Sequence, residues 1–217
     1  MVNMFIIFGA IVLLGGLLYW ETGKSRNGLL INKSALSILF VIAAAVQPHP
    51  LQGYYHYLLA GLLLCLAGDV LLALPQEKAF TLGLFAFLLG HVVYIGAFLK
   101  LIEVKDLFSI LPLVFVASSI LVFLWLRPHL GRMALPVVLY ILAITVMGMA
   151  ACAVYSKPAL QASGRTAILI GAICFYLSDV FVARNKFVKD EYINRLVGLP
   201  LYYGAQFLLA FSVGMLG

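Results

Sequence analysis

The chain has 217 residues, of which 65% are hydrophobic and only 10% are charged. A soluble globular domain is about half apolar and about a quarter charged, so this chain has too few polar residues to cover a water-soluble body of its size. The formal net charge of +6 would favour nucleic-acid binding in a soluble protein. Here the basic residues lie in short loops, where they set topology and contact lipid headgroups, which argues against nucleic acid as a partner.

The apolar residues form long unbroken runs, and not the alternating pattern of a membrane β-barrel. About 20 apolar residues are needed to cross a bilayer as a helix. We therefore predict an all-α membrane bundle of eight transmembrane helices, forming one domain over residues 1–217. The predicted spans are Val2 to Trp20, Ser34 to Gln47, Tyr55 to Leu74, Ala79 to Leu99, Leu107 to Leu126, Ala134 to Tyr155, Thr166 to Ala183, and Leu196 to Leu216.

The Lys and Arg residues are distributed unevenly between the loops. The odd-numbered loops hold ten of the fourteen: Lys24, Arg26, Lys33, Lys78, Arg127, Arg132, Arg184, Lys186, Lys189 and Arg195. Because cytoplasmic loops carry the excess of basic residues, we expect the odd loops to be cytoplasmic and both termini to lie on the non-cytoplasmic side.

A weak internal repeat relates the third and seventh spans. Leu66-Ala-Gly-Asp-Val70 resembles Tyr176-Leu-Ser-Asp-Val180, and because the seventh span comes four spans after the third, an even step, both segments have the same orientation. The repeat predicts that Asp69 and Asp179 lie at equivalent depths, near the cytoplasmic ends of their helices.

A carboxylate inside a span costs roughly 2.5 to 3.5 kcal/mol on insertion scales and marks a functional site by default. Either aspartate alone has a structural alternative, a hydrogen bond to a neighbouring helix. Two in matched contexts favour a shared site. If Asp69 and Asp179 face each other, they cannot easily both ionise, so the pair would hold a proton. Such a pair suits acid–base catalysis or proton-coupled transport, and the motif does not separate these.

Other polar residues lie in the predicted spans. His91 and Tyr94 share a helix face, as do Tyr202 and Gln206, while Tyr140 stands alone. The alternative for each tyrosine is an interface or packing role, and for His91 it is an interhelical hydrogen bond. Gln206 needs a partner within the bundle.

Lys33 lies at the cytoplasmic start of the second predicted span, where its alternatives are a topology anchor and a phosphate ligand. We predict no metal site, because His49, His56 and His129 lie in or near separate loops without a second ligand at helical spacing.

Several segments resemble the YhhN family, which includes lysoplasmalogenases. In the first half these are Leu66-Ala-Gly-Asp-Val-Leu-Leu-Ala-Leu74 and Gly83-Leu-Phe-Ala-Phe-Leu-Leu-Gly-His-Val-Val-Tyr-Ile95. In the second half they are Pro136-Val-Val-Leu-Tyr140 with Met147, Leu177-Ser-Asp-Val180, and Pro200-Leu-Tyr-Tyr-Gly-Ala-Gln206. The resemblance extends from about Lys33 to Gln206. One departure is Lys33-Ser34, where the family often has Lys-Pro.

The resemblance implies an eight-span hydrolase that cleaves the vinyl ether bond of lysoplasmalogens. The products would be a fatty aldehyde and glycerophospho-ethanolamine or glycerophospho-choline. Asp69 and Asp179 would form the acid–base pair. The residues expected to position substrate and water are Lys33, His91, Tyr94, Tyr140, Tyr202, Tyr203 and Gln206.

This chemistry needs neither a metal nor an organic cofactor, and the expected partners are a lysophospholipid substrate and membrane lipids. We expect a multi-pass protein of the bacterial inner (plasma) membrane, or of the endoplasmic reticulum in a eukaryote. Two alternatives remain open: a proton-coupled transporter of lipids or small molecules that uses the same aspartates, and a hydrolase of other lysolipids.

Overall fold

The computed structural model describes residues 1–23, 25–108 and 112–216, which form helices and no strand. The α-helices are α1 (Val2–Trp20), α2 (Arg26–Ala45), α3 (Gln52–Leu72), α4 (Glu77–Leu99), α5 (Leu113–Leu126), α6 (Ala134–Tyr155), α7 (Ala162–Ala183) and α8 (Tyr192–Met215). Three short 3₁₀ helices, Val104–Phe108 (η1), Arg127–His129 (η2) and Gly131–Met133 (η3), and a π-helical turn, Arg184–Val188 (η4), complete the elements. The all-α class is confirmed for the described part of the chain.

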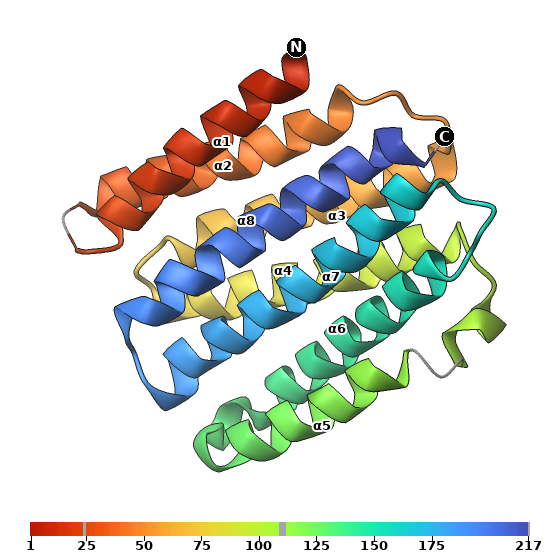
Figure 1. Ribbon diagram of the computed structural model, residues 1–217. Coiled ribbons are helices and arrows are strands. Elements are labelled where there is room, and N and C mark those ends of the chain that lie inside the picture. Colours follow the sequence, from red (N-terminus) through yellow and green to blue (C-terminus); the bar gives the residue numbers. More distant parts are fainter. Residues whose placement is uncertain (24, 109–111, 217) are drawn as a thin grey trace.

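Successive helices run up and down one bundle, so both termini lie at the same end (Figure 1). The helix α3 packs along α4, and α7 packs along α8. The outermost helix, α1, packs chiefly against α2, and only its residues Ile6 and Leu17 are buried. The turns α1–α2, α3–α4, α5–α6 and α7–α8 gather at the opposite end from the termini (Figure 1).

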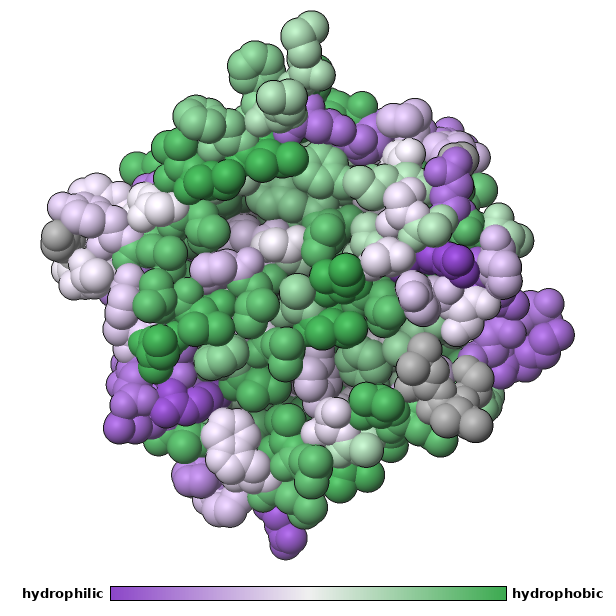
Figure 2. All heavy atoms as spheres, in the orientation of Figure 1, coloured by the Kyte–Doolittle hydropathy of each residue, from purple (hydrophilic) through white to green (hydrophobic). Residues whose placement is uncertain are grey.

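The surface and the helix lengths are those of a protein that crosses a membrane. Within the described residues, seven helices are long and apolar enough to span a bilayer. Figure 2 shows one face of the molecule, on which hydrophobic residues cover much of the surface and hydrophilic residues gather toward the edges. Large apolar side chains such as Phe5, Phe8 and Leu121 are exposed, and their exposure is stable only against lipid. The chain is a multi-pass integral membrane protein.

Two predicted spans, Val2 to Trp20 and Ala134 to Tyr155, agree with the bounds of α1 and α6. The second span was predicted to begin at Ser34, with an alternative start near Leu29, but α2 begins at Arg26. The reason is a helix cap, because the Ser25 hydroxyl accepts a hydrogen bond from the backbone N–H of Gly28. Lys33 therefore lies well inside α2 and not at its start. Lys24, counted above among the loop cations, lies outside the described residues.

The predicted fifth span, Leu107 to Leu126, was wrong at its start, because α5 is only Leu113–Leu126. Residues 104–108 form η1, residues 109–111 lie outside the described residues, and α5 begins only at Leu113, after Pro112 at the N-cap. At about 1.5 Å per residue, its 14 residues extend about 21 Å, less than the roughly 30 Å hydrocarbon core. The fifth predicted span is thus a short apolar helix, α5, at the side of the bundle.

Small residues allow close helix contacts around the two aspartates. A Cβ atom at Gly68, beside Asp69, would lie 2.7 Å from the Phe87 ring of α4. This close approach brings α4 against the last turns of α3. Both α3 and α7 end at the turn-rich end of the bundle, and each carries its aspartate within four residues of its last helical residue.

Candidate active site

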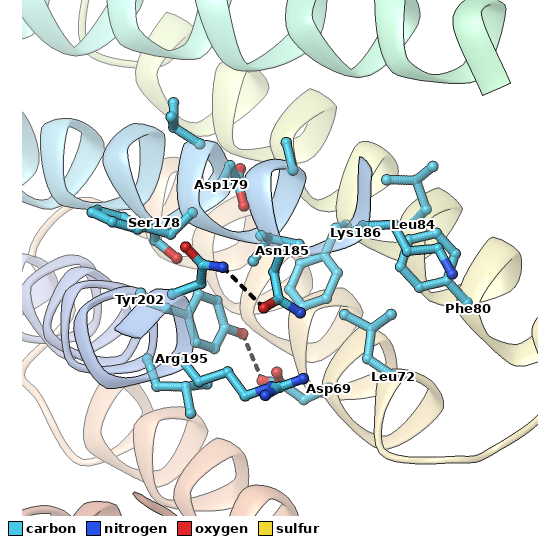
Figure 3. Close-up of a pocket in the computed structure, with 18 of the residues that line it drawn as sticks. Asp69, Leu72, Phe80, Leu84, Ser178, Asp179, Asn185, Lys186, Arg195 and Tyr202 are labelled. Carbon is cyan, nitrogen blue, oxygen red and sulfur yellow. Dashed lines mark hydrogen bonds between the residues drawn. The ribbon is translucent and has the colours of Figure 1, made fainter. Parts of the chain in front are cut away.

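A cavity of about 570 Å³ occupies the end of the bundle where α3 and α7 terminate. Asp69 and Asp179 both line it, from different helices (Figure 3). Part of its wall is apolar and comes from α5 and α6: Val122, Leu126, Val137, Ile141 and Ile144. The exposed side chains of Arg26 and Lys186 belong to its rim. The cavity therefore combines a charged rim, two carboxyl groups and a hydrocarbon-like wall.

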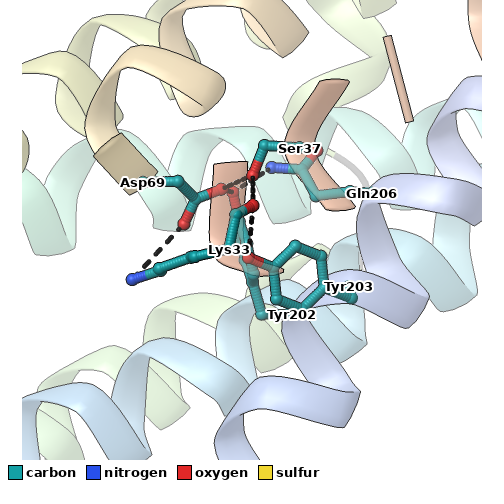
Figure 4. Close-up of polar contacts among 6 residues, drawn as sticks. All are labelled: Lys33, Ser37, Asp69, Tyr202, Tyr203 and Gln206. Carbon is teal, nitrogen blue, oxygen red and sulfur yellow. Dashed lines mark hydrogen bonds and ion pairs between the residues drawn. The ribbon is translucent and has the colours of Figure 1, made fainter. Parts of the chain in front are cut away.

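Asp69 is buried and surrounded by hydrogen-bond donors (Figure 4). Its Oδ2 atom accepts hydrogen bonds of 2.6 Å from the hydroxyls of Ser37 and Tyr202. Its Oδ1 atom lies 3.6 Å from Nζ of Lys33, whose side chain is itself mostly buried. An ammonium group and two hydroxyl donors together favour the ionised carboxylate.

A second layer of polar groups fixes these partners. The Tyr94 hydroxyl donates to Oε1 of Gln206 at 2.7 Å, and Nε2 of Gln206 donates to the Tyr202 hydroxyl at 3.1 Å. Since Tyr202 in turn donates to Asp69, all three hydrogen bonds point toward the carboxylate. The hydroxyl of Tyr203 donates to the backbone oxygen of Lys33 at 3.3 Å. The expected partner of the mid-span amide at Gln206 is thus provided by two tyrosines.

Asp179 has different surroundings. Its Oδ2 atom accepts a 2.9 Å hydrogen bond from the Tyr140 hydroxyl of α6 and lies 3.6 Å from Nε2 of His91 on α4. No Lys or Arg among the described residues lies within ion-pair distance of it. Its side chain is 19% exposed, whereas that of His91 is fully buried.

The hydrogen bonds of His91 determine where a proton can reside. Its Nδ1 atom lies 2.7 Å from the backbone oxygen of Phe87. A carbonyl oxygen can only accept, so Nδ1 carries hydrogen and Nε2 of the neutral ring is an acceptor. Nε2 has no hydrogen-bond partner and faces a carboxylate oxygen. Two acceptors face each other favourably only if a proton is held between them, on Asp179 or on His91.

The two carboxyl groups share a cavity but not a hydrogen bond: within the described ranges, no direct contact between Asp69 and Asp179 is formed. The buried ring of Phe175 connects their surroundings, since its centroid lies 4.6 Å from that of His91 and 5.4 Å from that of Tyr202. The arrangement is one carboxyl group held by two hydroxyl donors and an ammonium group, and one carboxyl–imidazole pair.

The predicted positioning residues fall into two groups. Lys33, Tyr140 and Tyr202 line the cavity together with the aspartates. His91, Tyr94, Tyr203 and Gln206 are buried behind them and do not line it. The second group therefore lies behind the cavity wall and contacts residues that line it.

Sequence reasoning missed Ser37, a buried hydroxyl one helical turn after Lys33. The signal was present, because a Lys and a Ser four apart lie on one face of α2. It also missed the rim, where Arg26, Lys186 and Arg195 line the cavity. Among the described residues, no group of three or more His, Cys, Asp or Glu is placed to hold a metal ion.

The fold and the cavity define a polytopic helical membrane protein with an intramembrane pair of carboxyl groups. The sequence model of the YhhN family matches residues 30–213. This range is most of the chain and includes Asp69, Asp179 and the polar residues that surround them. The protein belongs to the YhhN family.

Several similar proteins carry the name lysoplasmalogenase. The chain is 31% identical over 179 residues to the lysoplasmalogenase of Mycobacterium bovis, covering 79% of this chain and 63% of the relative. It is 34% identical over 194 residues to lysoplasmalogenase TMEM86B of Rattus norvegicus, covering 88% of this chain and 75% of the relative. The chain thus spans less than two thirds of the length of its mycobacterial relative. No solved structure matches it.

Proposed function

We propose that this protein is a membrane lysoplasmalogenase, which hydrolyses the vinyl ether bond of lysoplasmalogens to a fatty aldehyde and a glycerophospho-ethanolamine or glycerophospho-choline. The names of its relatives support the substrate class. The observation that carries the proposal is the unequal pair of carboxyl groups on one cavity with an apolar wall. Hydrolysis of a vinyl ether requires both an acid and a stabilised cation, and neither a metal nor an organic cofactor.

Asp179 is the proton donor in this proposal. It is the more exposed of the two carboxyl groups and has no ion-pair partner among the Lys and Arg residues described. The proton held between Asp179 and His91 moves to the β-carbon of the vinyl ether, and the bond electrons of the alkene form the new C–H bond. The α-carbon becomes an oxocarbenium ion, as in glycoside hydrolysis.

Asp69 remains ionised and supplies the negative charge that stabilises this cation. Its hydrogen bonds with Ser37 and Tyr202 and its contact with Lys33 hold the carboxylate in place before the reaction. Water adds to the α-carbon and gives a proton to the Asp179–His91 pair, which restores the acid. The resulting hemiacetal divides into the aldehyde and the free hydroxyl of the glycerophospholipid, so one water is consumed and no net proton.

The remaining predicted residues act by positioning. Tyr140 and Tyr202 orient Asp179 and Asp69, respectively, from the cavity wall. Tyr94, Gln206 and Tyr203 hold this arrangement from behind. The apolar side chains of α5 and α6 receive the alkenyl chain. A role of Lys33 in phosphate binding stays a prediction, and its contact in the structure is Asp69.

The cavity rim is proposed to face the cytoplasmic headgroup layer, with both termini on the other side of the membrane. The excess of Lys and Arg in the turns at this end supports the orientation. The membrane is proposed to be the bacterial plasma membrane, or the endoplasmic reticulum if the protein is eukaryotic.

The test is aldehyde release from a lysoplasmalogen by the purified protein in detergent, with Asp69→Asn and Asp179→Asn as isosteric variants. We expect turnover by the parent protein and a loss of about 10²-fold or more in kcat for each variant. Folded variants that both retain full turnover would exclude the two aspartates from the mechanism.

The same assay separates the alternatives. Aldehyde formation without a membrane gradient excludes a protein that only transports. A side-by-side comparison of vinyl-ether, alkyl-ether and acyl lysolipids separates a lysoplasmalogenase from a hydrolase of other lysolipids, since only the first acts on the vinyl ether alone.

A further inference from the structure

Some of the positively charged side chains that line the cavity have no carboxylate partner among the described residues. Among the described residues, seven Asp, Glu, Lys or Arg side chains line it: Glu21, Arg26, Lys33, Asp69, Asp179, Lys186 and Arg195. Lys33 pairs with Asp69, and Nε of Arg195 lies 3.3 Å from a carboxylate oxygen of Glu21. Asp179 accepts a hydrogen bond from Tyr140 and lies 3.6 Å from Nε2 of His91.

Two cations remain, Arg26 and Lys186. Neither has a carboxylate within ion-pair distance among the described residues, although other Lys and Arg side chains at the same end of the bundle do. Arg184 and Lys189, for example, both bind Glu191. The rim therefore carries uncompensated positive charge at the entrance to a cavity that is apolar along one wall.

Lys186 has a defined position at the rim. It lies on the π-helical turn η4 (Arg184–Val188), which extends α7 past Asp179. Its Nζ atom lies 4.2 Å from the centroid of the Phe80 ring of α4, and both residues line the cavity (Figure 3). This cation–π contact holds the ammonium group at the rim without neutralising its charge.

We infer that the rim is the binding site for a lysolipid's phosphate group, with Lys186 as its principal contact and Arg26 as a second cation. This inference rests on the proposed function, since it assigns the headgroup end of the same substrate. A phosphodiester is a fixed anion that Lys and Arg bind by charge-assisted hydrogen bonds. With the phosphate at the rim, the hydrocarbon chain meets the apolar wall and the ether linkage between them lies near the carboxyl groups.

The ordinary alternative is that Arg26 and Lys186 only anchor topology, as basic loop residues do. Kinetics separate the two explanations. We expect Lys186→Gln to raise KM for lysoplasmenyl-ethanolamine about tenfold, equivalent to loss of one charge-assisted contact, with little change in kcat. For 1-alkenylglycerol, which has the vinyl ether but no phosphate, KM should not change. Lys189→Gln, directly after the same turn and outside the cavity lining, is the matched control.

A binding measurement keeps this inference independent of catalysis. An alkyl-ether lysophosphatidylethanolamine, below its critical micelle concentration, should raise the Tm of the parent protein, and Lys186→Gln should remove most of that shift. Alkylglycerol should give a shift that does not depend on Lys186. Inorganic phosphate alone, at the same concentration, should give none, because it cannot use the apolar wall.

The outcomes are distinguishable. If no aldehyde is released but the Lys186-dependent shift occurs, the proposed reaction fails and the phosphate site stands. If aldehyde is released with equal KM values in parent and Lys186→Gln, for both substrates, the phosphate site is wrong and the reaction stands. A shift with inorganic phosphate as large as with the lysolipid assigns a free-anion site and overturns a lipid headgroup site.

Discussion

The Nε2 atom of His91 lies 3.6 Å from Oδ2 of Asp179 and has no hydrogen-bond partner, although the ring is fully buried. A buried polar atom left unpaired costs about 1–3 kcal/mol, so this geometry is unfavourable unless a proton is shared across it. By contrast, each oxygen of Asp69 has a close donor or cation. The two aspartates are therefore chemically distinct despite their similar sequence contexts.

Replacing His91 by leucine should separate stability from activity. The substitution removes an unpartnered buried nitrogen, and the Phe87 carbonyl that Nδ1 contacts remains bonded within the helix, so we expect an unchanged or slightly higher Tm. We expect kcat to fall about 10²-fold, because Asp179 loses the group with which it shares its proton. Thermal unfolding in detergent and an aldehyde assay measure the two effects.

If His91 shares the proton, His91→Leu should also change the pH profile of kcat, since the exchangeable proton would then reside on Asp179 alone. The matched control is Phe175→Leu, which removes a ring packed against His91 but no titratable group. An unaltered pH profile in His91→Leu, with kcat reduced no more than in the control, would indicate a packing role only.

The Lys33–Asp69 ion pair predicts strong non-additivity in a double-mutant cycle. Lys33→Met leaves the buried Asp69 carboxylate without its cation, and we expect a loss of about 3–5 kcal/mol in the free energy of unfolding. Combining Lys33→Met with Asp69→Asn removes both charges and should recover much of that stability, but not the activity. Denaturation of the four proteins gives the coupling energy.

The exposed pair of Lys105 and Glu103 provides the comparison, because its Nζ–Oε2 distance of 2.7 Å joins two largely exposed groups. A cycle on that pair should show little coupling. Additive effects at Lys33 and Asp69 would contradict a functional ion pair.

Much of the fold was predictable because only helices and closed β-barrels satisfy the backbone hydrogen bonds within a bilayer. Long apolar runs require helices in a bilayer, and α1 and α6 have the predicted bounds. The late start of α5 was missed because an apolar run marks residues that are compatible with lipid and does not mark where the helix begins. Pro112 lies within the predicted span, and α5 begins directly after it. Likewise, α2 begins before the apolar run because the Ser25 hydroxyl caps the helix by accepting a hydrogen bond from the backbone N–H of Gly28.

The sequence predicted which residues form the site better than it predicted the contacts between them. Because Asp69, Asp179 and Gln206 lie inside apolar runs, the sequence marks them as residues that need partners in a membrane. Which partner each has depends on helix rotation, which a single sequence does not specify. The contact of Tyr202 with Asp69 joins residues that are 133 positions apart, and the two aspartates, expected to face each other, each have their own partners.

Glu191, between α7 and α8, predicts an acid-sensitive step in stability. Hydrogen bonds from Lys189 and then Arg184 hold the pKa of its carboxyl group below the ordinary value of 4.5. A carboxyl group with a lowered pKa stabilises the folded protein above its unfolded-state value, and this contribution is lost as the pH falls through the folded value. In Glu191→Gln, Tm should therefore decrease less steeply below about pH 4.5.

The measurement is Tm against pH for the parent protein and for Glu191→Gln in the same detergent. The two curves should converge at the acid end and differ most near neutrality. Parallel curves across the whole range would mean that the contacts of Glu191 with Arg184 and Lys189 do not contribute to folding.

The last prediction concerns the packing of α7 against α8, which carry Asp179 and Tyr202. A Cβ atom at Gly164 would lie 2.6 Å from the backbone oxygen of Met215. Because backbone cannot move aside like a flexible side chain, Gly164→Ala should separate these helix ends and cost about 1–3 kcal/mol. Gly204→Ala on α8, where nothing lies within 4 Å of the added Cβ, should be neutral or slightly stabilising because alanine favours helix. Equal Tm values for the two variants would show that the contact at Gly164 is not tight.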